Sequence, residues 1–119
     1  MELKILKIQD RGTKDERIFI KILDDCNIGK FIVHDETFDE EGNKSNIWPH
    51  MYRFKHHDVK QGEYISLHIH QGKDRVGKTT QGNKCYIFYW GFDEDCSVFN
   101  SNSDTIHLIK IADETTTSV

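Results

Sequence analysis

Hydrophobic and polar residues alternate along most of the chain with the two-residue period of a β-strand. The clearest cases are residues 16–23, with Ile18, Ile20 and Ile22 on one face, and residues 64–70, with Ile65, Leu67 and Ile69 on one face. No helical period of 3.6 residues is sustained over ten residues anywhere in the sequence. The pattern therefore predicts an all-β protein in which one face of each strand supplies the core.

The same pattern divides the chain into eight expected strands. They are residues 3–8, 16–23, 29–35, 47–54, 64–70, 85–92, 96–100 and 105–111. Turn signals separate these segments about every 8–12 residues, which is typical of a β-sandwich or a β-barrel. Two polar segments without an apolar period, residues 36–46 and 71–84, are expected to be exposed loops.

Length and charge narrow the class of protein. A chain of 119 residues is expected to form one domain over residues 1–112, followed by a flexible tail at 113–119. The net charge of −4 argues against a primary role on nucleic acid or an anionic membrane, because phosphate binding needs clustered Lys and Arg. No apolar run approaches ~20 residues and no signal peptide is evident, so a cytoplasmic location without membrane insertion is expected.

The three cysteines, Cys26, Cys85 and Cys96, are widely spaced and odd in number. They contain no Cys-x-x-Cys pair that would suggest a zinc knuckle or a redox site. We expect buried free thiols rather than a disulfide framework.

Several short motifs occur in an order that resembles one known family. They are Phe-Ile-Val at 31–33, Tyr-Arg-Phe at 52–54, Val-Lys-Gln-Gly at 59–62, Tyr-Trp-Gly at 89–91 and an Asn-Ser turn within 100–108. This order resembles the globular tail domain of nuclear lamins and its bacterial relatives, from about Leu3 to Ile111. The chain departs from that pattern at Ser103, where bacterial relatives often have Gly, and by a long inserted loop at 36–46.

The resemblance implies an immunoglobulin-like β-sandwich of about seven to nine short, mostly antiparallel strands. It also implies a non-catalytic docking module, because family members use this domain for attachment rather than for catalysis. The lamin rod with its heptads is absent from the sequence, so a role in filaments does not follow.

Two histidines offer a possible metal site. His68 and His70 lie two residues apart on an expected strand, so both side chains should leave the same face. Gly62, five further residues and His-Ile-His resemble the start of a cupin metal motif, for which Asp74 and His107 are the remaining candidate ligands. The second cupin motif is missing, and a solvated strand face is the preferred interpretation. We therefore expect no metal and no cofactor, and a cupin-like metal-binding β-barrel enzyme is the alternative.

Other residues are candidates for contact with a partner. Trp48 stands beside Pro49, and His56 and His57 form a modestly basic corner. The most basic segment contains Lys73, Arg75, Lys78 and Lys84. Within residues 86–91, one alternating set of aromatic residues should fill the core, and the other could form an exposed platform on which bases stack.

Together these observations predict a docking module that binds an unidentified protein, as a monomer or a weak homodimer. The contact surface is expected at the loops 39–45 and 71–84 or at an exposed sheet edge. A nucleic-acid-associated accessory domain that uses the basic segment is a weaker alternative.

Overall fold

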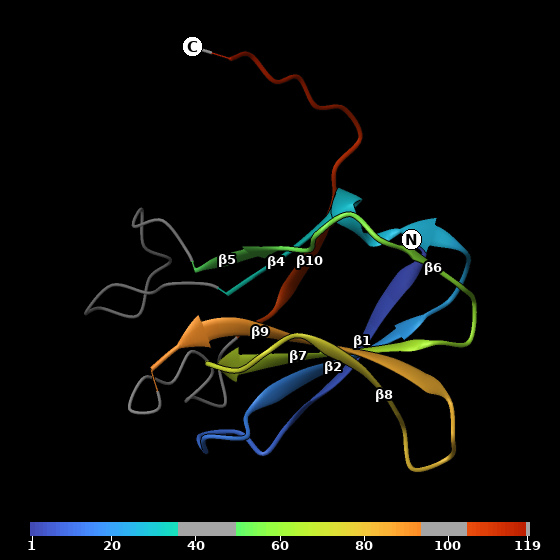
Figure 1. Ribbon diagram of the computed structural model, residues 1–119. Helices are drawn as coiled ribbons and strands as arrows, with labels where there is room; N and C mark the ends of the chain where they lie inside the picture. The colour runs from blue at the N-terminus through green and yellow to red at the C-terminus, as the bar shows by residue number, and fades with distance from the viewer. Residues whose placement is uncertain (36–49, 94–104, 119) are drawn as a thin grey trace.

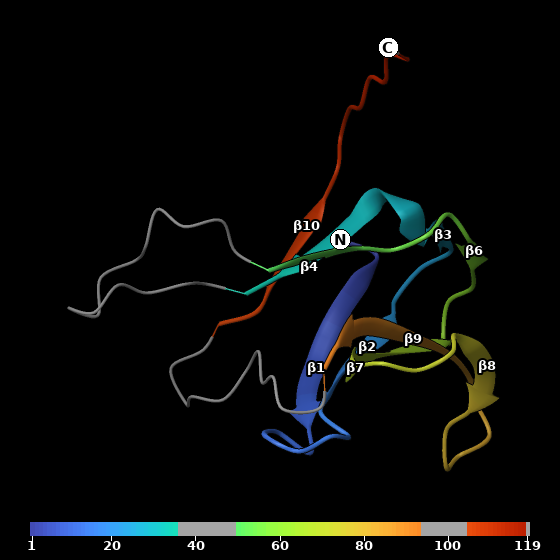
Figure 2. The same ribbon diagram turned by 60° about the vertical axis from the view of Figure 1, so that its left-hand side comes forward.

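The computed structural model describes residues 1–35, 50–93 and 105–118, which form two layers of β-sheet (Figure 1). One layer is a five-stranded sheet in the order β1-β2-β7-β9-β8. The other contains a three-stranded sheet in the order β10-β4-β5, and a two-stranded sheet, β3-β6, lies beside it (Figure 2). The described residues contain no α-helix, only a single 3₁₀ turn, η1 (Ile28–Lys30). The prediction of an all-β sandwich is confirmed.

The five-stranded sheet is built from the long alternating segments. Its strands are β1 (Leu3–Gln9), β2 (Arg17–Ile22), β7 (Tyr64–His70), β9 (Lys84–Phe92) and β8 (Arg75–Lys78). All neighbours pair antiparallel except β7 and β9, which run parallel. The register of β7 and β9 shifts near Gly91, whose φ of 106° is a conformation that glycine adopts without steric cost.

The second layer is made of shorter strands. They are β4 (Phe31–His34), β5 (Met51–Arg53) and β10 (His107–Lys110), with β3 (Cys26–Asn27) and β6 (Asp58–Val59) in the two-stranded sheet. The buried carboxylate of Asp35 links the ends of β4 and β5. One of its oxygens accepts a hydrogen bond from the backbone N–H of His50 at 2.7 Å, and the other lies 2.8 Å from Nδ1 of the His50 ring.

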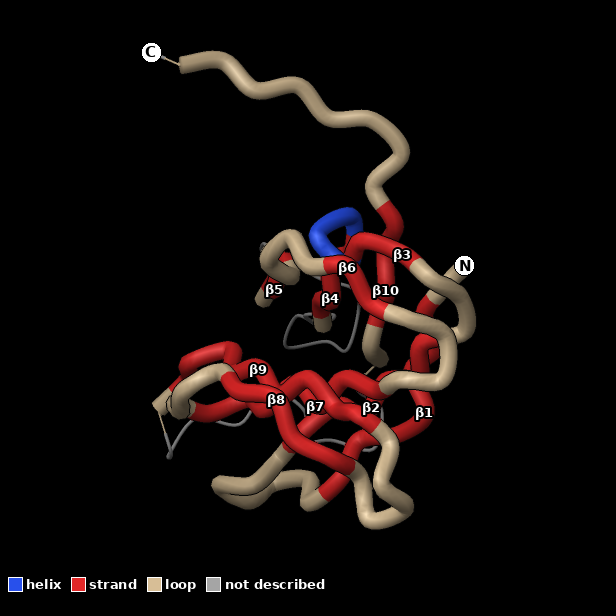
Figure 3. Tube along the Cα trace, turned by 45° about the vertical axis from the view of Figure 1, so that its right-hand side comes forward, coloured by secondary structure: helices blue, strands red, loops and turns tan. Residues whose placement is uncertain are grey.

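The hydrophobic core lies between the two layers, whose arrangement can be followed in the tube view (Figure 3). The five-stranded sheet contributes the alternating Ile and Leu residues that the sequence pattern assigned to the inside. The opposite layer contributes Phe31, Val33 and Phe54, all nearly inaccessible to solvent. Phe88 and Trp90 of β9 pack against this core, so the inward set of the aromatic strand is Tyr86, Phe88 and Trp90.

One expectation about the elements needs correction, and others lie outside the described residues. The expected loop at 71–84 is wrong in part, because it contains β8, an edge strand that forms a hairpin with β9. The described residues contain ten short strands, close to the expected number of about seven to nine. The expected loop tip at 39–45, Trp48, Cys96 and the strand at 96–100 lie outside the described residues.

The described residues include no helix that is long and apolar enough to cross a membrane.

Candidate functional site

The outer face of the five-stranded sheet, which points away from the core, carries an open groove. No described element covers this face, which lies below the sheet in Figure 1. The groove has a volume of about 850 Å³. Small side chains, Ser66 and Cys85, form its floor and are themselves 5% and 4% exposed. Larger side chains from β2, β8 and the β8–β9 turn stand on either side.

Strand register explains which side chains meet in the groove. One cross-strand row runs Lys7–Phe19–Ser66–Ile87–Arg75, from the β1 edge to the β8 edge. Residues that lie directly opposite each other on paired strands leave the same face of the sheet. The row therefore places an aliphatic and aromatic centre between two cationic edges.

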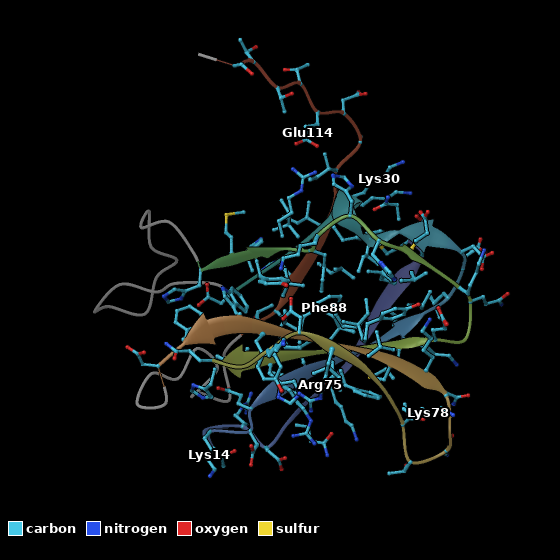
Figure 4. All side chains as sticks on the ribbon, viewed as in Figure 1. Lys14, Lys30, Arg75, Lys78, Phe88 and Glu114 are labelled. Carbon is cyan, nitrogen blue, oxygen red and sulfur yellow. The ribbon has the colours of Figure 1, made fainter. Side chains whose placement is uncertain are left out.

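Positive charge dominates the groove. Among the described residues that line it, Lys7, Arg17, Arg75 and Lys78 are cationic, and none is Asp or Glu. Figure 4 shows Arg75 below the five-stranded sheet and Lys78 on the β8–β9 hairpin, while Lys30 lies on the opposite layer. This local cluster is notable because the whole chain has a net charge of −4.

Both arginines of the groove are held by their neighbours. The Arg75 guanidinium donates a short hydrogen bond to the Tyr89 hydroxyl and lies 5.8 Å from the centre of the Tyr89 ring. The Tyr89 ring is itself fixed by Gly72, where an added Cβ would come within 2.2 Å of a ring carbon. Arg17 donates to the Asp10 carboxylate and to the Asp15 carbonyl, each at 2.9 Å. The two guanidinium groups are therefore positioned before any ligand arrives.

Two pairs of stacked rings accompany these charges. Phe19 of β2 and Tyr64 of β7 stack with their centres 5.4 Å apart and an interplanar angle of 19°. His68 stacks on Tyr89 at 4.8 Å. Burial, followed by the nearby charges of Arg17 and Arg75, lowers the pKa of His68 below its ordinary value of 6.5. Its imidazole is therefore neutral at pH 7 and able to stack.

His68 and His70 line the same hollow, but the ring of His70 is engaged by the backbone. His70 is only 5% exposed, and both of its ring nitrogens contact backbone carbonyl oxygens. Nδ1 lies 2.9 Å from the oxygen of Asp93, and Nε2 lies 3.1 Å from that of Thr13. His70 therefore joins the end of β7 to the β1–β2 turn, and the expectation that its side chain is solvated is wrong.

The other candidate ligands are also engaged elsewhere. One carboxylate oxygen of Asp74 accepts a hydrogen bond from the backbone N–H of Tyr89 at 3.0 Å, and the other lies 3.4 Å from the Lys55 ammonium. His107 belongs to the three-stranded sheet, where its ring stacks on His34 at 4.5 Å. In the part of the chain that the structure describes, no three His, Cys, Asp or Glu side chains form a group that could hold a metal ion.

The candidate contact residues are spread over different surfaces. Arg75 and Lys78 line the groove, whereas Lys73 is exposed outside it. Lys84 lies 5.1 Å from the centre of the Tyr86 ring, and the His57 ring also packs on Tyr86. His56 packs against Gly29. The basic segment thus contributes only part of its charge to the groove.

Sequence reasoning missed the groove residues on β1 and β2, namely Lys7, Arg17 and Phe19. Each was assigned to a strand, and the alternation in residues 16–23 already placed Arg17 and Phe19 on the face opposite the isoleucines. Knowing that these residues meet Tyr64 and Arg75 requires the order and register of the strands.

Comparison with known proteins adds no relative, since no protein-family model and no curated protein matches the chain.

Proposed function

We propose that this protein is a non-catalytic docking module of the lamin-tail type that acts in the cytoplasm. Its binding surface is the groove on the outer face of the five-stranded sheet, and its partner presents negative charge there. The observation that carries this proposal is the set of four cationic side chains around the groove, with no carboxylate among its described lining residues.

The fixed positions of the two arginines support binding. A charged side chain that is already held in place loses less conformational freedom when a ligand binds, so more of the interaction energy remains as affinity. Complementary charge also speeds association and favours acidic partners over basic ones. The β-sheet supplies a rigid base for this surface, because its opposite face is buried in the core.

The proposal is tested by titrating isotopically labelled protein with a poly-glutamate peptide at low salt and following backbone amide chemical shifts. We expect the shifts to concentrate on β2, β7, β8 and the β8–β9 turn. Lys78→Glu should weaken binding about three- to tenfold, which corresponds to about 1 kcal/mol.

Lys30→Glu is the matched control, since Lys30 is an exposed lysine on η1, in the opposite layer. It produces the same change in net charge, so an effect of net charge alone would weaken both variants equally. Equal weakening, or shifts spread over the other layer, would contradict the proposed site.

A further inference from the structure

We propose that the anionic partner of the groove is single-stranded nucleic acid. This inference rests on the proposed function, because it names the partner class for the same surface. The phosphates would contact cations at both edges of the sheet, and the bases would stack on the ring pair of Phe19 and Tyr64 between them.

Two like charges lie directly opposite each other on the groove face of the five-stranded sheet, where Lys4 on β1 faces Lys21 on β2. Directly opposed like charges destabilise a sheet, so they are disfavoured unless another interaction balances them. A chain of phosphates that lies across the sheet would provide that interaction.

This lysine pair begins a row that crosses the sheet. Lys21 is paired in turn with Tyr64, Tyr64 with Cys85, and Cys85 with Gly77, which directly precedes Lys78 of the groove. The row from Lys4 to Gly77 therefore crosses all five strands and ends beside Lys78. With neighbouring strands about 4.8 Å apart, it spans about 19 Å, the width of a short run of nucleotides.

The aromatic pair distinguishes nucleic acid from an acidic peptide. Phe19 and Tyr64 both line the groove and are partly exposed, although they lie on the polar face of the sheet. Bases have flat faces that stack on such rings largely independently of sequence, whereas glutamate and aspartate side chains do not. Cations beside exposed aromatic rings are the combination found on single-strand binding surfaces.

The same arrangement favours a single strand over a duplex. In a duplex the bases already stack on each other, so rings on a sheet can reach them only after the strands separate. The positive charge is also confined to one part of this face. The hollow that adjoins the groove is lined by Asp15 and Asp93 as well as by Lys14. A short flexible strand can follow the cationic end of the face and avoid these carboxylates.

The test measures fluorescence anisotropy of three labelled probes of similar charge at low salt. The probes are an oligothymidylate of about twelve nucleotides, a poly-glutamate peptide and a DNA duplex. We expect the oligothymidylate to bind about tenfold tighter than the other two probes. With three or four phosphate contacts, the slope of log K against log salt should be about −2 to −3.

Two ring variants separate stacking from charge. Phe19→Leu and Tyr64→Leu should each weaken oligothymidylate binding by roughly tenfold and leave poly-glutamate binding unchanged. Both replacements keep an apolar side chain at a partly exposed position, and circular dichroism with thermal melting checks that each variant is folded. Lys78→Glu should weaken the binding of every anionic probe, and Lys30→Glu should weaken none.

The outcomes distinguish this inference from the proposed function. Equal binding of oligothymidylate and poly-glutamate, with no effect of the ring variants, would overturn the nucleic-acid inference and leave the docking groove supported. Tighter binding of the duplex would also overturn it. If none of the three probes binds at low salt, both proposals are wrong.

Discussion

The guanidinium group of Arg53 on β5 donates two hydrogen bonds to the carboxylate of Glu114, each 2.6 Å long. The Nε of Arg53 also donates to the carbonyl of Gly29 at 3.0 Å. Glu114 lies beyond the last strand, in the segment that the sequence predicts to be a flexible tail. The pair therefore attaches the beginning of that segment to the outer side of the smaller layer, where Figure 4 shows Glu114.

Glu114→Gln should release this attachment without unfolding the domain. Both partners are solvent-exposed, so we expect little change in Tm. Heteronuclear NOE values for residues 113–116 should fall toward those of an unfolded chain. The hydrogen bonds from Arg53 lower the pKa of Glu114, so in the native protein the tail should stay attached until the pH falls below 4.5. Unchanged NOE values in the variant would show that other contacts hold the segment.

Because Phe31 lies in the core between the layers, Phe31→Ala should greatly lower the stability of the protein. Phe31 is fully buried and connects β4 to the opposite sheet. Removing the ring leaves a cavity, and we expect the free energy of unfolding in urea to fall by about 3–5 kcal/mol. Val76→Ala on β8 is the control, because Val76 is 57% exposed and its loss should change stability by less than about 0.5 kcal/mol. A small effect at Phe31 would contradict the two-layer packing.

Local alternation explains why much of the fold could be predicted. The inward residues of β2 and β7 follow directly from the two-residue period, since side chains on a strand point alternately to its two faces. The strand β8 could not be recognised in this way. Arg75 and Val76 are exposed on this edge strand, and Gly77 has no side chain, so burial imposes no alternation. The parallel pairing of β7 with β9 was equally inaccessible, because pairing between distant strands leaves no local pattern.

The candidate site depended on the same long-range pairing. The sequence identified Arg75 and Lys78 as basic, and it identified a possible exposed aromatic platform on β9. The aromatic pair in the groove instead comes from β2 and β7, where Phe19 and Tyr64 each stand among the polar positions of an alternating strand. Their meeting is a consequence of register between strands that are more than forty residues apart in the chain.

His70 should contribute to stability rather than to metal binding. Its two ring contacts join β7 to the carbonyls of Thr13 and Asp93 in a buried position. We expect His70→Ala to lower the free energy of unfolding by about 2–3 kcal/mol, because it removes a buried ring together with its contacts to the two carbonyl oxygens. His70→Gln should restore part of this loss, and Lys73→Ala on the exposed connection should have little effect.

Metal analysis provides an independent check on His70. Mass spectrometry of the purified, untagged protein should find no stoichiometric zinc, iron or manganese, and a chelator should leave Tm unchanged. Stoichiometric metal that is lost in the double variant His68→Ala, His70→Ala would instead support the cupin-like alternative.

Tyr52 should make the protein sensitive to alkaline pH. Burial, followed by the charge of Asp74, raises the pKa of Tyr52 from 10.0 to about 12. Between these values the unfolded chain has released a proton that the folded protein retains, so stability should fall as pH rises from about 10 to about 12. Tyr52→Phe should remove this part of the decline in urea unfolding measured at several pH values. Its ring can still pack against Phe54 and Trp90, so stability at pH 7 should change little.

His68 should make the groove sensitive to acid. Because burial and the charges of Arg17 and Arg75 lower its pKa, the unfolded chain takes up a proton before the folded protein does as pH falls through about 6.5. The contribution of His68 to stability is therefore present above that pH and is lost as the pH falls toward the lowered value. NMR titration of the His68 ring should give a midpoint below 6.5, and Arg75→Gln should move it upward. A midpoint that Arg75→Gln leaves unchanged would show that the Arg75 charge does not act on His68.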